Sequence, residues 1–128
     1  MAKILLVCSE NTLAEKYTKY LIESGFDVET ELSAKDGLDR IGDEFFPAAV
    51  ACLPREESLW FLIKVRALHR VSASSTPILV ITDEKSDSLS EYFDSGATKA
   101  LRAFDTTSDQ LGESLKRILN IPRMRLSL

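Results

Sequence analysis

Cysteine is scarce in this chain: there are two in 128 residues, Cys8 and Cys52, and they do not form a CxxC pair. Two thiols are too few for a disulfide framework or a structural zinc site. Such scarcity is typical of a reducing compartment, so we expect a cytoplasmic protein. The first residues lack a signal peptide's order of segments, and no apolar run approaches the roughly 18 residues that a membrane span needs.

An excess of positive charge is also missing. The formal net charge is −4 and the isoelectric point is near 5.0, whereas nucleic-acid binding needs lysine and arginine gathered on one face. We therefore expect no direct nucleic-acid binding and no membrane association by this domain. The only basic stretch follows Pro122. We interpret residues 1–120 as one domain and residues 121–128 as a basic tail or the start of a linker.

Glycine is absent where a phosphate-binding loop would need it. The segment after the first apolar run reads Cys8-Ser9-Glu10-Asn11, and a loop that cradles a nucleotide or flavin phosphate normally contains glycine there. A nucleotide or flavin binder is therefore disfavoured, and we expect no cofactor.

Short apolar segments that alternate with helical patterns are what the sequence does contain. Hydrophobic residues make up 45% of the chain, enough for a full core. Most of these segments are apolar throughout, which indicates strands buried on both faces of a parallel sheet; the second alternates, as an edge strand does. The predicted strands are 3–7, 26–32, 48–53, 78–82 and 98–102.

Helical periodicity and turn residues fill the intervals between these strands. We expect Asn11 or Thr12, Ser33 and Ser108 to cap helices, and Leu38, Ile41 and Phe45 to face the core, with Leu89 and Phe93 later in the chain. The predicted helices are 11–23, a segment between Ser33 and Pro47, 58–70, 86–95 and 108–119. The short serine-rich stretch 72–75 is interpreted as a loop.

Five strand–helix units predict an α/β fold with a doubly wound, flavodoxin-like parallel sheet in the order 2-1-3-4-5. The order of the strands reverses between the first and third strands, and open α/β sheets place their sites at that carboxyl edge. Any site should therefore use residues that follow Val7, Cys52 and Ile81.

The ordered set of segments resembles a response-regulator receiver domain over nearly the whole chain. No single motif is decisive, but their order and intervals are fairly specific. The segments that carry the resemblance are Ile4-Leu5-Leu6-Val7-Cys8-Ser9-Glu10, the helix, turn and edge strand of 21–41, Pro47-Ala48-Ala49-Val50-Ala51-Cys52-Leu53, Thr76-Pro77-Ile78-Leu79-Val80-Ile81-Thr82, and Ser95-Gly96-Ala97.

The resemblance implies a phosphorylation site that this chain has largely lost. In active receivers an aspartate after the third strand accepts a phosphoryl group, and two acidic residues after the first strand hold Mg²⁺. Here the acceptor position is Leu53, and a shift of one residue gives Cys52 or Pro54, which are not carboxylates either. The acidic pair becomes Cys8 and Ser9, so only Glu10 remains as a hard oxygen ligand nearby.

The phosphate-holding positions are altered as well. Thr82 is kept at the end of the fourth strand, but Asp83 adds negative charge beside it. The fifth-strand lysine of the family becomes Ala103, or Arg102 if one gap is allowed. The aromatic residue that often reports activation becomes Ala100.

From this comparison we expect a degenerate receiver, neither an enzyme nor a metal binder, that works without phosphorylation by contacting proteins in a signalling pathway. Its partners would be a fused output domain, a histidine-kinase system or a second copy in a homodimer. The alternative is an active receiver whose phosphoacceptor has moved to Asp83 or Glu56.

Two further features suggest contacts or chemistry. Trp60 and Phe61 lie in five consecutive apolar residues of one helix, which cannot all face a sheet; with Tyr92 and Ala100 they are the candidate interaction residues. Cys8 and Cys52 end two strands that should be neighbours, so a redox pair is conceivable within disulfide geometry. We favour two small buried hydrophobic residues.

Overall fold

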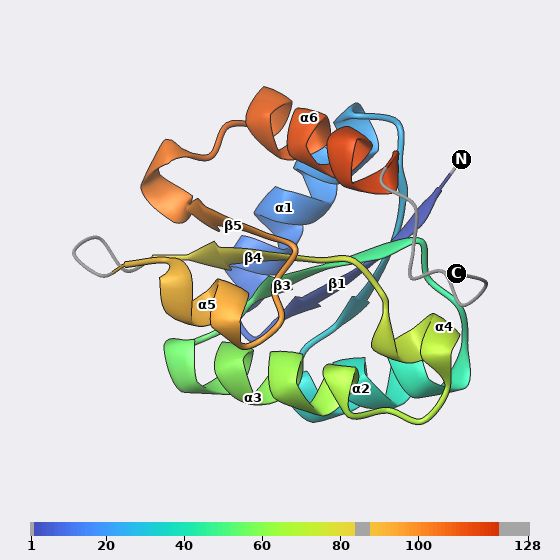
Figure 1. Cartoon of the computed structure of the whole chain (residues 1–128). Coiled ribbons are helices and arrows are strands. Elements are labelled where there is room, and N and C mark those ends of the chain that lie inside the picture. Colours follow the sequence, from blue (N-terminus) through green and yellow to red (C-terminus); the bar gives the residue numbers. More distant parts are fainter. Residues whose placement is uncertain (1, 84–87, 121–128) are drawn as a thin grey trace.

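A five-stranded parallel sheet in the order β2-β1-β3-β4-β5 forms the centre of the computed structural model, which describes residues 2–83 and 88–120. This confirms the predicted α/β, flavodoxin-like topology (Figure 1). The strands are β1 (Lys3–Cys8), β2 (Asp27–Glu31), β3 (Ala48–Cys52), β4 (Ile78–Thr82) and β5 (Lys99–Arg102). The helices are α1 (Asn11–Glu23), α2 (Ala34–Asp43), α3 (Arg55–Arg66), α4 (Val71–Ser74), α5 (Ser90–Asp94), the 3₁₀ helix η1 (Ala103–Asp105) and α6 (Ser108–Leu119).

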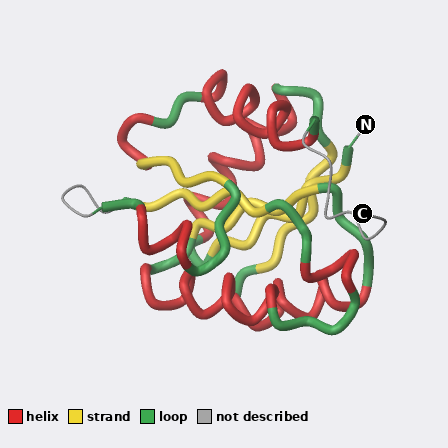
Figure 2. The backbone as a smooth tube through the Cα atoms, viewed as in Figure 1, coloured by secondary structure: helices red, strands yellow, loops and turns green. Residues whose placement is uncertain are grey.

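Helices cover both faces of the sheet (Figures 1 and 2). Side chains of β1, β3 and β4 alternate between the two faces, so each face has its own core. One core includes Leu5, Val7 and Phe61 beneath α2 and α3. The other includes Leu6, and it packs against α1 and α6. Burial on both faces explains why these three strands are apolar throughout.

The third helix differs from its prediction. It spans Arg55–Arg66 rather than 58–70, because it begins directly after Pro54, whose fixed φ suits a helix entry. Glu56 and Glu57 then lie in the first turn, where carboxylates are favourable. A separate short helix, α4, occupies part of the stretch interpreted as a loop.

Two predicted helix caps are wrong and one is confirmed. Ser33 accepts a hydrogen bond from the backbone N of Asp36 at 3.1 Å, as expected. Asn11 is instead the first residue of α1, which has no side-chain cap. Thr107, one residue before Ser108, caps α6 and forms a reciprocal pair with Gln110.

Three aromatic residues lie on the opposite side from their prediction. Helix α2 ends at Asp43, and the extended backbone at Glu44 directs Phe46 into the core and leaves Phe45 exposed at 59%. Helix α5 has only five residues, and it buries Tyr92 to 1% exposure while Phe93 stays on the surface. The predicted helix positions 86 and 87, and the tail 121–128, lie outside the described residues.

No helix within residues 2–83 and 88–120 has both the length and the apolar character of a membrane span.

Candidate functional site

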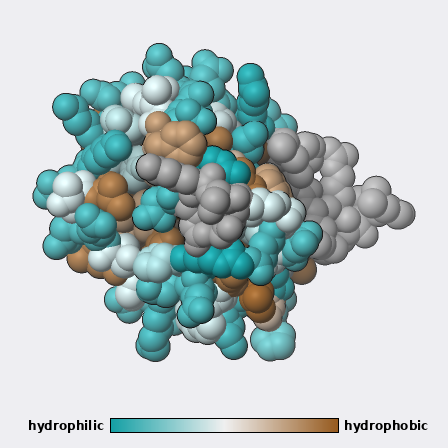
Figure 3. Space-filling view, turned by 90° about the vertical axis from the view of Figure 1, so that its left-hand side faces the viewer, coloured by the Kyte–Doolittle hydropathy of each residue, from teal (hydrophilic) through white to brown (hydrophobic). Residues whose placement is uncertain are grey.

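A pocket of about 270 Å³ lies at the carboxyl edge of the sheet. This edge is the left-hand side of Figure 1 and faces the viewer in Figure 3, where brown apolar patches lie between teal hydrophilic residues. Residues after β1, β3 and β4 contribute to it, as the switch-point rule predicts. The lining residues are Ser9, Glu10, Leu13, Cys52, Leu53, Pro54, Arg55, Ile81, Asp83 and Ala103.

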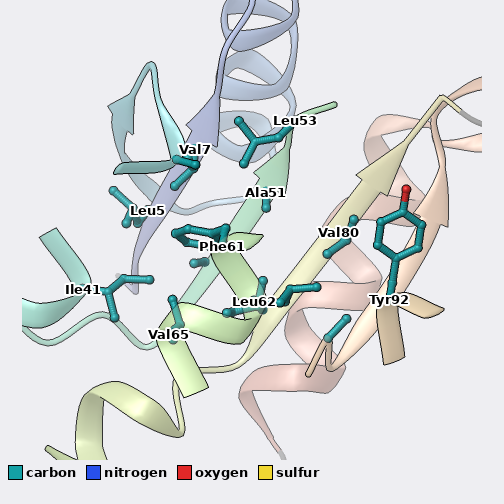
Figure 4. Close-up of a cluster of buried hydrophobic side chains, with 14 of the residues drawn as sticks. Leu5, Val7, Ile41, Ala51, Leu53, Phe61, Leu62, Val65, Val80 and Tyr92 are labelled. Atoms are coloured by element: carbon teal, nitrogen blue, oxygen red, sulfur yellow. The ribbon is translucent and has the colours of Figure 1, made fainter. Parts of the chain in front are cut away.

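Leu53 occupies the position where the resemblance implies a phosphoacceptor. Only 7% of its surface is exposed, and it belongs to the core that contains Val7 and Phe61. Figure 4 shows its side chain extending from the end of β3 toward Val7. The backbone is held too, since the hydroxyl of Ser58 donates to the carbonyl of Leu53 at 3.2 Å. An alkyl group packed in this way closes the floor of the pocket and offers no oxygen to a phosphoryl donor.

The residues after β1 do not fit the magnesium ion that the fold family implies. Cys8 is completely buried, and its Sγ lies 3.5 Å from the carbonyl of Glu10. Ser9 and Glu10 line the pocket, where the other carboxylate is Asp83. Within residues 2–83 and 88–120, no three His, Cys, Asp or Glu side chains come together as ligands for a metal ion. A thiol, a hydroxyl and an alkyl group are poor replacements for the carboxylates that Mg²⁺ prefers.

Thr82 does not line the pocket. It is buried, and its hydroxyl shares a hydrogen bond of 3.1 Å with the hydroxyl of Tyr92. The next residue, Asp83, is exposed and lines the pocket. The end of β4 therefore presents a carboxylate, and not a hydroxyl, to the pocket.

Residues of β5 and the residue that follows it line two different cavities. Ala103 lines the pocket and carries no charge. Arg102 and Ala100 instead line a different groove, of about 540 Å³, between β5 and α6. Of the two residues considered for the lysine position, Ala103 lines the pocket and Arg102 does not.

Arg55 is the cation of this pocket, and sequence reasoning missed it. The residue lines the pocket from the first turn of α3, and its guanidinium forms an ion pair with Glu91 of α5. The predicted helix begins at residue 58, so the sequence gives no reason to expect the side chain of Arg55 at the site. The ion pair partly neutralises Arg55, which reduces its attraction for an anion.

Cys8 and Cys52 are paired residues of the neighbouring strands β1 and β3, as expected, and both are free thiols. Both belong to the core on the α1 and α6 side of the sheet. A hydrogen bond from the Cys52 thiol lowers the pKa of Cys8 to about 7, against the opposing effect of burial. The same bond, together with burial, raises the pKa of Cys52.

Three of the four candidate interaction residues are buried, which corrects the prediction. Phe61, Tyr92 and Ala100 are at most 5% exposed and pack in one core. Trp60 remains 40% exposed, beside the exposed Ile63 one helical turn later. The helix face decides this outcome, because Phe61 lies on the stripe of α3 that meets the sheet.

Comparison with solved structures identifies the fold as that of receiver domains. A receiver domain protein from Methanospirillum hungatei superposes with a TM-score of 0.79 at 24% identity, covering 94% of each chain. The chemotaxis response regulator CheY4 of Vibrio cholerae gives 0.78 at 25% identity, over 92% of this chain and 98% of that one.

A third solved structure has the same fold. The receiver domain of a sensor histidine kinase from Pseudomonas aeruginosa gives a TM-score of 0.82 at 17% identity, over 94% of this chain and 98% of that one; it has a magnesium ion coordinated in its active-site cleft. No protein-family model matches the sequence, and no curated protein matches it closely.

Proposed function

We propose that this chain is a receiver-like signalling module of two-component ancestry that acts through protein contacts and does not depend on phosphorylation. The fold and the order of its motifs support the ancestry. Leu53 carries the rest of the proposal, because it is packed into the core where a phosphoacceptor would have to reach a donor. Phosphoryl transfer relies on positioning and charge neutralisation, and this pocket supplies neither a carboxylate acceptor there nor a Mg²⁺ ligand set.

The direct test is an NMR titration of the whole chain with Mg²⁺ and beryllofluoride, which mimics a bound phosphoryl group. We expect backbone amide signals near Leu53 and Thr82 to keep their positions. A phosphorylatable receiver domain treated in parallel is the positive control. Large, saturable shifts around Leu53 and Thr82 would contradict the proposal.

The rival proposal is an active receiver with a relocated acceptor, and the two candidate carboxylates are not equal. Asp83 lines the pocket, whereas Glu56 is an exposed residue in the first turn of α3 that does not line it. Incubation with acetyl phosphate and Mg²⁺ followed by intact-mass measurement tests this proposal. A phosphoryl adduct that appears in the native chain and disappears in Asp83→Asn would support it; no adduct in either chain supports the phosphorylation-independent module.

Protein contact is the remaining part of the proposal, and the surface of α3 supports it best. Trp60 and Ile63 are large apolar side chains exposed three residues apart on one helix face, and exposed tryptophan is a frequent anchor of interfaces. Sedimentation velocity over a concentration series tests the homodimer form of this proposal. A dimer that Trp60→Ala dissociates would support contact through this face between two copies, and a monomer at all concentrations would exclude a homodimer.

A further inference from the structure

The pair of thiols beside the pocket, Cys8 and Cys52, is the most reactive feature of this edge of the sheet. Cys8 and Cys52 are register partners on adjacent parallel strands, and such strands lie about 4.8 Å apart. Disulfides span Cα separations of roughly 4.4–6.8 Å. Since both side chains enter the same core, the two sulfurs extend from the same face of the sheet, and the Cα separation expected of paired strands falls within the disulfide range.

The pocket gives access to one of the two cysteines. Cys52 is 8% exposed and lines the pocket, whereas Cys8 is completely buried behind it. A small oxidant that enters the pocket therefore reaches the sulfur of Cys52 first. Cys8 is placed to react second, from inside the protein.

A polar group without a hydrogen-bond partner belongs to the same core as the two cysteines. Among the residues that the structure describes, the hydroxyl of Tyr17 is the buried side-chain oxygen that lacks a hydrogen bond. Burial, followed by negative charge on Cys52, Tyr20 and Cys8, raises the pKa of Tyr17 to about 12. This core therefore combines the two thiols with a buried hydroxyl whose hydrogen bond is unmade.

We propose that Cys8 and Cys52 form a reversible intramolecular disulfide when a peroxide enters the pocket at the carboxyl edge of the sheet. This inference goes beyond the signalling proposal and does not depend on it. It reverses the preference that the sequence alone suggested, because the strand register and the pocket now place the two thiols as a pair with one open side.

The chemistry balances with hydrogen peroxide as the oxidant. As the sulfur of Cys52 attacks one peroxide oxygen, its proton moves to the Cys8 thiolate, which acts as the base. The O–O bond breaks, hydroxide leaves, and Cys52 becomes a sulfenic acid. The Cys8 thiol then attacks the sulfur of Cys52, the S–O bond breaks, and water leaves with the Cys8 proton. Two thiols are oxidised by two electrons, and one peroxide is reduced to water and hydroxide.

The test treats the reduced full chain with hydrogen peroxide and then maps its peptides without reduction. We expect loss of both free thiols, a chain lighter by two hydrogen atoms, a peptide that links Cys8 to Cys52, and recovery of both thiols with dithiothreitol. Linkage between two chains, sulfinic acid without a linked peptide, or two thiols that survive treatment would each overturn the proposal.

Two variants test the order of the steps. In Cys8→Ala the sulfenic acid on Cys52 should accumulate and react with dimedone, because its resolving thiol is missing. In Cys52→Ala the remaining thiol is buried and should stay reduced under the same exposure. Circular dichroism checks that each variant folds, and the peptide map of the native chain decides the proposal even if one does not.

Discussion

At the scale of single residues, Leu53 shows how one side chain limits what a pocket can do. A leucine side chain moved from water into a core stabilises the fold by about 2 kcal/mol. A carboxylate at the same buried position would lose hydration, and the nearby cation, Arg55, is already paired with Glu91. The residue is thus suited to packing against Val7 and Phe61 and gives the pocket an apolar floor.

Truncation of Leu53 tests this packing role. We expect Leu53→Ala to lower the free energy of unfolding by about 2–5 kcal/mol, the range for buried leucines, and Leu53→Asp to lower it further. Urea denaturation followed by circular dichroism measures both. Phe104→Ala is the matched surface control, because that side chain is 60% exposed. If Leu53→Asp were as stable as the native chain, the position would still accept a carboxylate.

The buried Tyr17 predicts that the stability of the fold depends on pH in the alkaline range. Its folded pKa of about 12 exceeds the ordinary value of 10.0, so the folded state favours the neutral phenol. The resulting stability is complete below pH 10 and is lost as the pH rises from 10 toward 12. Urea unfolding at several pH values should show Tyr17→Phe losing less stability across this window than the native chain does.

Neutral pH supplies the control for this tyrosine. Because its buried hydroxyl lacks a partner, Tyr17→Phe should be as stable as the native chain at pH 7, or more stable. A clear loss of stability there would mean that the hydroxyl makes a favourable contact.

At the scale of elements, sequence reasoning was most successful where one physical rule decides the outcome. The strands β1, β3 and β4 agree within one residue at either end, because continuous apolar runs have few alternatives in an α/β chain. Helix α5 has only five residues, which is too short for periodicity to distinguish Tyr92 from Phe93. The break between α3 and α4 depends on tertiary hydrogen bonds that the local sequence pattern does not predict.

Arg66 makes those tertiary bonds. Its guanidinium donates to the carbonyls of Ser74 at 2.8 Å, Thr76 at 2.7 Å and Gly96 at 2.6 Å, so the end of α3 is tied to the turns that precede β4 and β5. Gly96 has a φ of +120°, and a Cβ there would lie 2.8 Å from Cγ of Arg66. Glycine is therefore needed both for the turn and for the approach of the arginine.

Removal of this guanidinium should destabilise the fold. We expect Arg66→Met to lower the free energy of unfolding by roughly 3 kcal/mol, because it leaves three carbonyls without their charged donor. Lys64→Met, at an exposed position of the same helix, should change it by less than about 0.5 kcal/mol. Equal, small effects of both substitutions in urea denaturation would show that water replaces the arginine without loss.

At the scale of the whole molecule, the location of the candidate site was predictable and its chemistry only partly so. The strand order places the residues after β1, β3 and β4 at one edge, and the pocket is found there. The packing of α3 and α5 against that edge determines the position of Arg55 and its ion pair with Glu91. It also determines that Thr82 bonds to Tyr92 and stays out of the pocket. These are tertiary outcomes, which explains why the alignment of motifs alone did not reveal them.

The effect of magnesium on the melting temperature tests whether the folded chain binds this ion. A ligand that binds only the folded state raises its stability by RT ln(1 + [L]/Kd), which is about 2.7 kcal/mol at one hundred times Kd. Because the pocket contains two separate carboxylates rather than a ligand set, we expect the melting temperature to be the same in millimolar MgCl₂ and in NaCl of equal ionic strength. Equal ionic strength matters for a chain of net charge −4, since screening alone changes its stability. A melting temperature that rises steadily with MgCl₂ concentration would show that the edge of the sheet binds a cation. Loss of that rise in Glu10→Gln or Asp83→Asn would show that these carboxylates are its ligands.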